Sequence, residues 1–156
     1  MDKLLIVRLS SLGDIIHAIP VAAALREAFP SAQIDWLVEA RYRELLETVT
    51  VLDHVLVIDF SSIGHTARTI TTMRNLRTTR YDCAIDVQGL LRSAVLARMS
   101  GAGRTIGFTR PHLREKAARA LYTDVCSPQP GCHRIQKNLS LLKALGCPTI
   151  TVRFPL

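Results

Sequence analysis

Asp14 is the residue of this sequence best placed to do acid–base chemistry. It follows Ser-Ser-Leu-Gly at residues 10–13, directly after an apolar run at residues 4–9. A carboxylate at a helix entrance can take a proton from a hydroxyl nucleophile as a general base. The helix N-terminus would lower the pKa of this carboxyl and keep it ionised at neutral pH. The structural alternative is that Asp14 is only a helix N-cap, a role that aspartate fills well.

The residues around Asp14 are typical of a loop that lies against a ligand. Ser10 and Ser11 offer hydroxyl groups, and Gly13 lets the backbone approach a ligand closely. His17 lies three residues on, on the same side of the expected helix. For His17 the alternative is an ordinary packed or solvated histidine. The loop lacks the GxGxxG and Walker A patterns, so we do not expect it to hold a nucleotide.

A second candidate loop is "DVQGLLRSA" at residues 86–94. Gln88 and Gly89 form its turn, and Arg92 stands at the start of the next expected helix. Backbone N–H groups together with an arginine make an anion site. A solvated surface arginine is the alternative. Further positive charge is expected near the exit of the fifth strand, from Arg104, Arg110, Arg114 and Lys116.

We expect no metal centre in this chain. Its four cysteines contain no CxxC pair, and Cys126, Cys132 and His133 match no common zinc spacing. Reduced thiols are the simpler interpretation.

Alternating strands and helices must position the two loops. Strands are expected at residues 4–9, 33–38, 54–59, 81–87 and 104–107, and helices at 15–28, 42–49, 63–79, 90–99, 113–122 and 133–146. Pro20 predicts a kink or a break after the first turn of its helix, and residues 149–156 predict a further strand or an exit segment. The pattern indicates an α/β fold, a Rossmann-like parallel sheet flanked by helices. Ligands of such sheets bind outside the carboxyl ends of the strands, where both loops lie.

The composition of the chain limits the classes of partner that it is expected to bind. The chain has 156 residues, of which 48% are hydrophobic, and a formal net charge of +7. Positive charge favours anionic partners. Only 5% of the residues are aromatic, and the absence of a base-stacking motif argues against nucleic acid. No apolar stretch reaches the ~20 residues of a membrane span, and no signal peptide is recognised. We therefore expect a cytoplasmic or peripheral protein.

Four segments together resemble a known family. They are "LLIVRLSSLGDIIHAIPVAAALREAFPSAQIDWLVE", "YDCAIDVQGLLRSAVLAR", "IGF" followed by "REKAARALY", and "HRIQKNLSLLKALG". In this order they resemble the lipopolysaccharide heptosyltransferases, glycosyltransferase family 9. The segments "SSLGDIIHAIP" and "DVQGLLRSA" most resemble the sequences of the heptosyltransferase I branch.

The resemblance implies half of a GT-B enzyme, in which two Rossmann-like domains face each other across the active site. Residues 1–156 would form a single acceptor-binding domain, with the carboxy-terminal donor-binding domain absent from this sequence. That domain would bind the donor substrate ADP-heptose, and no cofactor or metal is implied. The acceptor would be the phosphorylated Kdo-lipid A inner core, reached at the inner face of the cytoplasmic membrane. Asp14 would be the catalytic base of an inverting transfer, and Arg92 and Arg114 would meet acceptor phosphates.

Several expectations concern the chain without a donor domain. We expect it to be inactive as a transferase, and its uncovered interdomain face predicts self-association. The alternative is a non-catalytic Rossmann-like domain that binds an anionic ligand or a partner. A third interpretation is a related transferase with another donor or acceptor sugar, because the residues that would read the donor lie outside this sequence. "DFSSIGHTARTI" at residues 59–70 lacks the dense basic cluster of some members, which leaves the charge and identity of the acceptor open.

Overall fold

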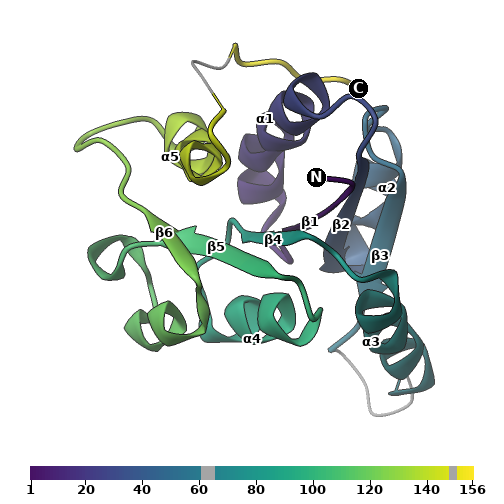
Figure 1. Cartoon of the computed structure of the whole chain (residues 1–156). Helices are drawn as coiled ribbons and strands as arrows, with labels where there is room; N and C mark the ends of the chain where they lie inside the picture. The colour runs from purple at the N-terminus through teal and green to yellow at the C-terminus, as the bar shows by residue number, and fades with distance from the viewer. Residues whose placement is uncertain (61–65, 148–150) are drawn as a thin grey trace.

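Six parallel strands form the centre of the molecule (Figure 1). The computed structural model describes residues 1–60, 66–147 and 151–156. The strands are β1 (Lys3–Val7), β2 (Gln33–Glu39), β3 (His54–Ile58), β4 (Cys83–Asp86), β5 (Arg104–Phe108) and β6 (Asp124–Cys126). Their order in the sheet is β3-β2-β1-β4-β5-β6. This order confirms the expected Rossmann-like parallel sheet.

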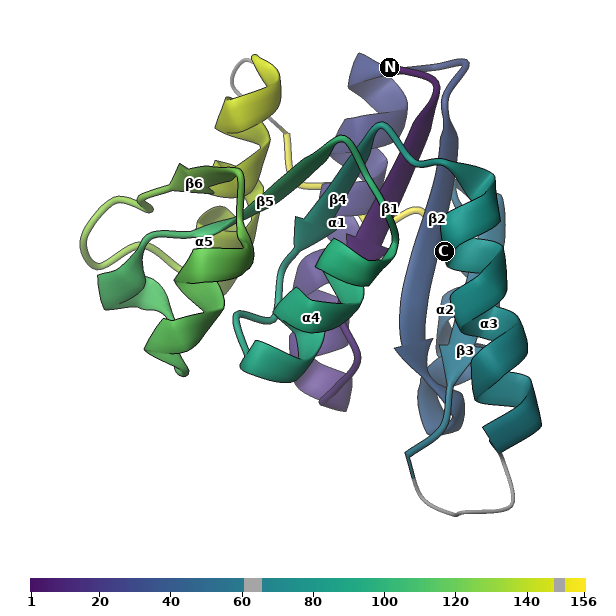
Figure 2. The same ribbon diagram turned by 60° about the horizontal axis from the view of Figure 1, so that its bottom comes forward.

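Helices cover both faces of the sheet. They are α1 (Leu12–Ala28), α2 (Arg43–Glu47), α3 (Thr66–Thr79), α4 (Leu91–Met99) and α5 (Arg134–Ser140). α1, α2 and α5 lie on one face, and α3 and α4 on the other; in Figure 2, α3 and α4 stand in front of the sheet and α1 behind it. β1 contributes side chains to both hydrophobic clusters, such as Leu4 to one and Leu5 to the other. Burial on both faces explains why this strand is a continuous apolar run.

The chain reverses its direction of winding between β1 and β4. From β1 the sheet grows outward through β2 and β3, and on the other side of β1 it grows through β4, β5 and β6. The loops that leave β1 and β4 therefore diverge toward opposite faces and open a crevice between them. Both candidate loops of the sequence stand at this switch point.

The first helix differs from its prediction at two residues. Ser11 is the N-cap of α1, and Asp14 stands in the first turn, so the interpretation of Asp14 as the N-cap is wrong. The predicted break at Pro20 is also wrong, because α1 runs unbroken from residue 12 to 28 with Pro20 inside it. Pro20 is buried with most of the helix. Burial of this long helix against the sheet offsets the local cost of a proline, about 3 kcal/mol.

The last third of the chain is less regular than predicted. The helix expected at residues 113–122 is replaced by two 3-10 turns, Arg110–His112 and Lys116–Leu121, and the three-residue strand β6 was not predicted. The predicted last helix is α-helical only to Ser140 and continues as a 3-10 turn to Leu145 before Gly146, whose φ is 72°. Arg104 begins β5 instead of standing at its exit.

Two other predicted segments are only partly described. Residues 63–65, the predicted start of the third long helix, lie outside the described residues, as do residues 149–150 of the tail. Residues 151–156 form no strand. The backbone N–H of Thr50 donates to the carbonyl of Pro155, which holds this segment beside the end of α2.

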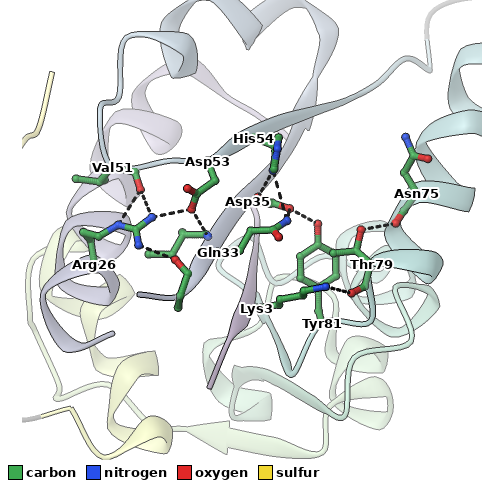
Figure 3. Close-up of polar contacts among 12 residues, drawn as sticks. Lys3, Arg26, Gln33, Asp35, Val51, Asp53, His54, Asn75, Thr79 and Tyr81 are labelled. Atoms are coloured by element: carbon green, nitrogen blue, oxygen red, sulfur yellow. Dashed lines mark hydrogen bonds and ion pairs between the residues drawn. The ribbon is translucent and has the colours of Figure 1, made fainter. Parts of the chain in front are cut away.

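Polar side chains join the strands away from the candidate loops (Figure 3). Asp35 of β2 is almost fully buried, and its carboxylate accepts hydrogen bonds from the Tyr81 hydroxyl and, at 2.7 Å, from Gln33 Nε2. His54 Nδ1 lies 2.9 Å from the other carboxylate oxygen. Burial and the Asp35 charge raise the pKa of Tyr81. The cluster satisfies a buried carboxylate and links β2 to β3 and β4.

Candidate active site at the carboxyl edge of the sheet

A cavity of about 500 Å³ opens where the loops after β1 and β4 meet. Residues from four regions line it: the loop after β1, the start of α1, the loop after β4, and the segment from β5 to α5. Its polar and charged lining is formed by Arg8, Ser10, Ser11, Asp14, His17, Gln88, His112, Arg114, Arg134, Lys137 and Asn138. The cavity lies at the switch point, the usual ligand position in this fold.

Asp14 is held by hydrogen bonds and ion pairs on both oxygens. Oδ2 accepts from Ser11 Oγ at 2.9 Å and lies 2.8 Å from Arg8 Nη2. Oδ1 accepts from Arg134 Nη1 at 2.7 Å. Partial burial would raise the pKa of Asp14, but the Ser11 hydrogen bond and the charges of Arg8 and Arg134 outweigh it, and the pKa is lowered. The carboxyl is therefore ionised at neutral pH, as the sequence predicts.

Arg8 is the buried partner of Asp14. Its side chain is 12% exposed, and Nη1 donates to the carbonyl of Val87 at 3.0 Å. The indole N–H of Trp36 donates to the carbonyl of Arg8 at 3.0 Å. Desolvation by burial lowers the pKa of Arg8 below its ordinary value, although the neighbouring Asp14 favours its charged form. Arg8 thus ties the loop after β1 to the loop after β4.

A buried carboxylate shapes the second loop. Asp86, at the end of β4, accepts hydrogen bonds from the backbone N–H groups of Gln88 and Gly89, at 3.0 and 3.2 Å, and from Ser93 Oγ and the Tyr122 hydroxyl. Its burial raises its pKa, although these donors favour the ionised form. The turn then presents Gln88 to the loop after β1.

Gln88 acts as a bridge between the two loops. Its side-chain oxygen accepts from the backbone N–H of Leu9 at 2.7 Å and lies 3.4 Å from that of Ser10. A side chain from the loop after β4 therefore holds the loop after β1 in position. Because these contacts occupy its oxygen, the amide nitrogen is the part of Gln88 left to face a ligand.

Cations dominate the far wall of the cavity. Arg114 stands in the connection between β5 and β6, and Arg134 and Lys137 stand on α5. Lys137 Nζ donates to the carbonyl of His112 at 3.2 Å and lies 4.8 Å from the centre of the Phe108 ring. Desolvation lowers the pKa of Lys137. These cations outnumber the carboxylate of Asp14, so the cavity favours an anionic ligand.

His17 lines the cavity from α1. Its Nδ1 is buried and has no hydrogen-bond partner in the described part of the chain. Its ring meets that of His133 edge-on, with centroids 5.7 Å apart. Asn138 Nδ2 donates to the carbonyl of His17 at 3.0 Å, which joins α5 to α1.

The structure brings most of the predicted site residues together, but not all of them. Ser10, Ser11, Asp14, His17, Gln88 and Arg114 line the one cavity. Gly13 is not part of its lining. Arg92 lies in a second hollow of about 520 Å³ beside the ends of β2 and β3. There its guanidinium is 3.2 Å from Glu39 Oε1 and stacks 4.5 Å from the centre of the Phe60 ring.

Sequence reasoning missed three cations of the cavity, namely Arg8, Arg134 and Lys137. Arg8 could have been found, because it interrupts an apolar run where the strand ends. Arg134 and Lys137 are three residues apart and share one side of a helix. Arg134 lies 120 residues after Asp14 in the chain. The contact between them depends on how α5 packs against α1, which the local sequence does not show.

Two further observations concern the described residues only. All four cysteines are free thiols, and no group of three or more His, Cys, Asp or Glu side chains is arranged to hold a metal ion. Among the helices that the structure describes, none is long and apolar enough to cross a membrane.

Known proteins resemble this chain in sequence. The sequence profile of glycosyltransferase family 9 (heptosyltransferase) matches residues 69–153. Lipopolysaccharide heptosyltransferase 1 of Pseudomonas aeruginosa is 31% identical over 154 residues, which cover 94% of this chain and 43% of that protein. The protein of the same name from Salmonella typhimurium is 29% identical, and the match covers 92% of this chain and 48% of that protein. The chain thus spans about half the length of the curated relatives it matches.

Solved structures agree in fold. The E. coli heptosyltransferase WaaC with ADP superposes with a TM-score of 0.87 at 24% identity, covering 98% of this chain and 51% of that one. The structure of the E. coli ADP-heptose LPS heptosyltransferase II superposes with a TM-score of 0.74 at 19% identity, and the match covers 99% of this chain and 46% of that one. The fold of this chain is therefore that of half a GT-B glycosyltransferase. Since the family profile also spans more than half of its residues, this chain belongs to glycosyltransferase family 9, the heptosyltransferase family.

Proposed function

We propose that this chain is the acceptor-binding half of an inverting heptosyltransferase, which moves heptose from ADP-heptose to the phosphorylated Kdo-lipid A inner core. The observation that carries the proposal is the ionised Asp14 at a cavity walled by cations. The loop after β1 has neither the GxGxxG nor the Walker A pattern that holds nucleotide phosphates. The donor therefore belongs to a second domain, facing this edge of the sheet.

In the proposed reaction Asp14 is the general base. Its carboxylate takes the proton of the acceptor hydroxyl as the hydroxyl oxygen attacks the anomeric carbon of the heptose. The new carbon–oxygen bond forms on the face opposite the leaving group, and the bond from the anomeric carbon to the phosphate oxygen breaks. ADP leaves with that electron pair, so the configuration inverts. Ser11 and Arg8 fix the direction in which Asp14 points.

The two hollows suit an acceptor with more than one anionic group. Arg114 and Lys137 would meet one such group beside Asp14, with Ser10, His17 and Gln88 against the sugar. Arg92 would meet another in the second hollow, after leaving Glu39. Because the acceptor is a lipid, the enzyme would work as a peripheral protein at the inner face of the cytoplasmic membrane.

Reconstitution tests the proposal. The chain is mixed with the separately produced donor half of a family 9 relative, ADP-heptose and Kdo-lipid A, and transfer is followed by mass spectrometry. We expect heptose transfer only when both halves are present, because neither carries the base and the donor site together. The control omits this chain.

A non-catalytic anion-binding domain is the second candidate, and the cationic wall of the cavity favours it. It predicts acceptor binding without transfer in every mixture. Heptose transfer by the mixture would exclude this second candidate. If the donor half binds ADP-heptose and this chain binds the acceptor, but no heptose is transferred, the enzyme proposal is contradicted.

A further inference from the structure

The two oxygens of Asp14 are held by partners of different mobility. Arg8, on Oδ2, is 12% exposed and is anchored by its bond to Val87. Arg134, on Oδ1, has a side chain that is 71% exposed. Asp14 is the one hydrogen-bond or ion-pair partner of the Arg134 guanidinium among the described residues. Exposed long side chains with one partner exchange that partner at little cost.

This arrangement is unfavourable for a base. A carboxylate receives a proton through an oxygen lone pair, and here each oxygen already accepts from a charged donor. Two arginines also lower the pKa of Asp14 and so weaken it as a base. Oδ1 accepts from Arg134 alone and keeps a second lone pair for a proton, so loss of one arginine is not required but would strengthen Asp14 as a base. Since Arg8 is anchored, Arg134 is the arginine that can leave.

The cavity offers Arg134 another partner when a phosphate enters. The charged and titratable side chains that line the cavity together with Asp14 are Arg8, His17, His112, Arg114, Arg134 and Lys137. Lys137 follows Arg134 by three residues on α5, and Arg114 faces the same space. A phosphate among these side chains would carry more charge than Asp14 and would accept both N–H groups of a guanidinium.

We propose that Arg134 is a positioning residue that pairs with Oδ1 of Asp14 in the free protein and moves to a phosphate group of the acceptor when the acceptor binds. Acceptor binding would thus free Oδ1 and make Asp14 a stronger base for the acceptor hydroxyl. This inference rests on the proposed function for its purpose, but the exchange of the ion pair is measurable without catalysis.

The test follows the Asp14 carboxyl by carbon-13 NMR in the 156-residue chain. Its pKa is measured with and without inorganic phosphate in the wild type and in Arg134→Gln, Arg134→Lys and Arg114→Gln. Without phosphate, we expect Arg134→Gln to raise the pKa of Asp14 by about 0.5–1 unit, because an ion pair is lost. Arg134→Lys should restore most of the wild-type value. Arg114→Gln is the matched control, a cation of the same wall that does not touch Asp14, and should shift the pKa least.

Phosphate distinguishes an exchanging arginine from a fixed one. In the wild type, we expect phosphate to raise the Asp14 pKa by clearly more than in Arg134→Gln, where no ion pair remains to be broken. Equal shifts in the two proteins, or a phosphate-free Arg134→Gln with the wild-type pKa, would overturn the proposal. If Asp14→Asn kept full turnover, the proposed function would fail instead, and the NMR result would stand by itself.

Discussion

At the scale of single residues, Asp14 shows how a carboxylate can be charged and yet restrained. The charge is kept by Ser11, Arg8 and Arg134 together, against partial burial. The sequence singled out Asp14 from its place after a strand and predicted its ionisation from the helix N-terminus. The alternative that Asp14 is the N-cap is wrong, because Ser11 is the N-cap. Sequence reasoning did not find the arginines, because ion pairs between distant segments leave no local pattern.

The lowered pKa of Asp14 predicts a pH dependence of stability. In the unfolded chain the carboxyl titrates near 3.8, and in the folded chain it titrates lower. The ionised form therefore stabilises the folded state fully above pH ~4, and this contribution is lost as the pH falls through the folded pKa. Asp14→Asn removes it. We expect the gap in unfolding free energy between wild type and Asp14→Asn to narrow as the pH falls from about 5 to about 2.5.

Urea unfolding at a series of pH values measures this gap. Asp82 and Asp124 also have lowered pKa values and contribute to the acid sensitivity of both proteins. Comparing the two proteins at each pH cancels those contributions. If the difference in unfolding free energy between wild type and Asp14→Asn stayed constant over the whole pH range, Asp14 would not stabilise the fold through its charge.

At the scale of elements, the fold was predictable where the apolar pattern is strong. Strands β1 to β5 and helix α1 contain runs of apolar residues, and the sequence predicted each of them within a few residues. β6 has only three residues, too few for a period. Residues 113–122 have a helical pattern, but the chain instead makes tight turns that bring the Tyr122 hydroxyl to the buried Asp86. Such a tertiary contact overrides local propensity.

Gly107 in β5 is the position on which that contact depends. A Cβ added there would lie 2.2 Å from the ring of Tyr122. Gly107→Ala therefore pushes the ring away and leaves the buried Asp86 without one of its donors. We expect a loss of about 2–4 kcal/mol in unfolding free energy, measured by urea denaturation.

Gly103→Ala is the matched control for that substitution. Its added Cβ would meet only the backbone carbonyl of Asp82 at 3.4 Å, an ordinary contact. We expect a change of about 1 kcal/mol or less. If Gly107→Ala were as stable as this control, the packing of Tyr122 against β5 would not be what holds Asp86.

At the scale of the whole molecule, the fold concentrates part of the net positive charge at one cavity. The net charge of +7 predicted an anionic partner, and the structure gathers four cations at the switch point of the sheet. Of the cations expected near the end of β5, Arg114 lines the cavity, whereas Arg104 lies at the other end of β5, where it pairs with Asp124. Exposed apolar side chains such as Leu12 and Ile16 lie on α1 near the cavity. The expected self-association through this face stays a prediction.

The most direct test of the account is the turnover of Asp14→Asn in heptose transfer, with this chain paired with a donor half and supplied with ADP-heptose and acceptor. Asparagine keeps the shape of the side chain but cannot accept the proton, so we expect turnover to fall by about 10²–10⁴-fold while acceptor binding is retained. Asp124→Asn, which removes an ion-paired aspartate remote from the cavity, should keep wild-type turnover. Turnover of Asp14→Asn within about threefold of wild type would contradict the central claim that this carboxylate is the base.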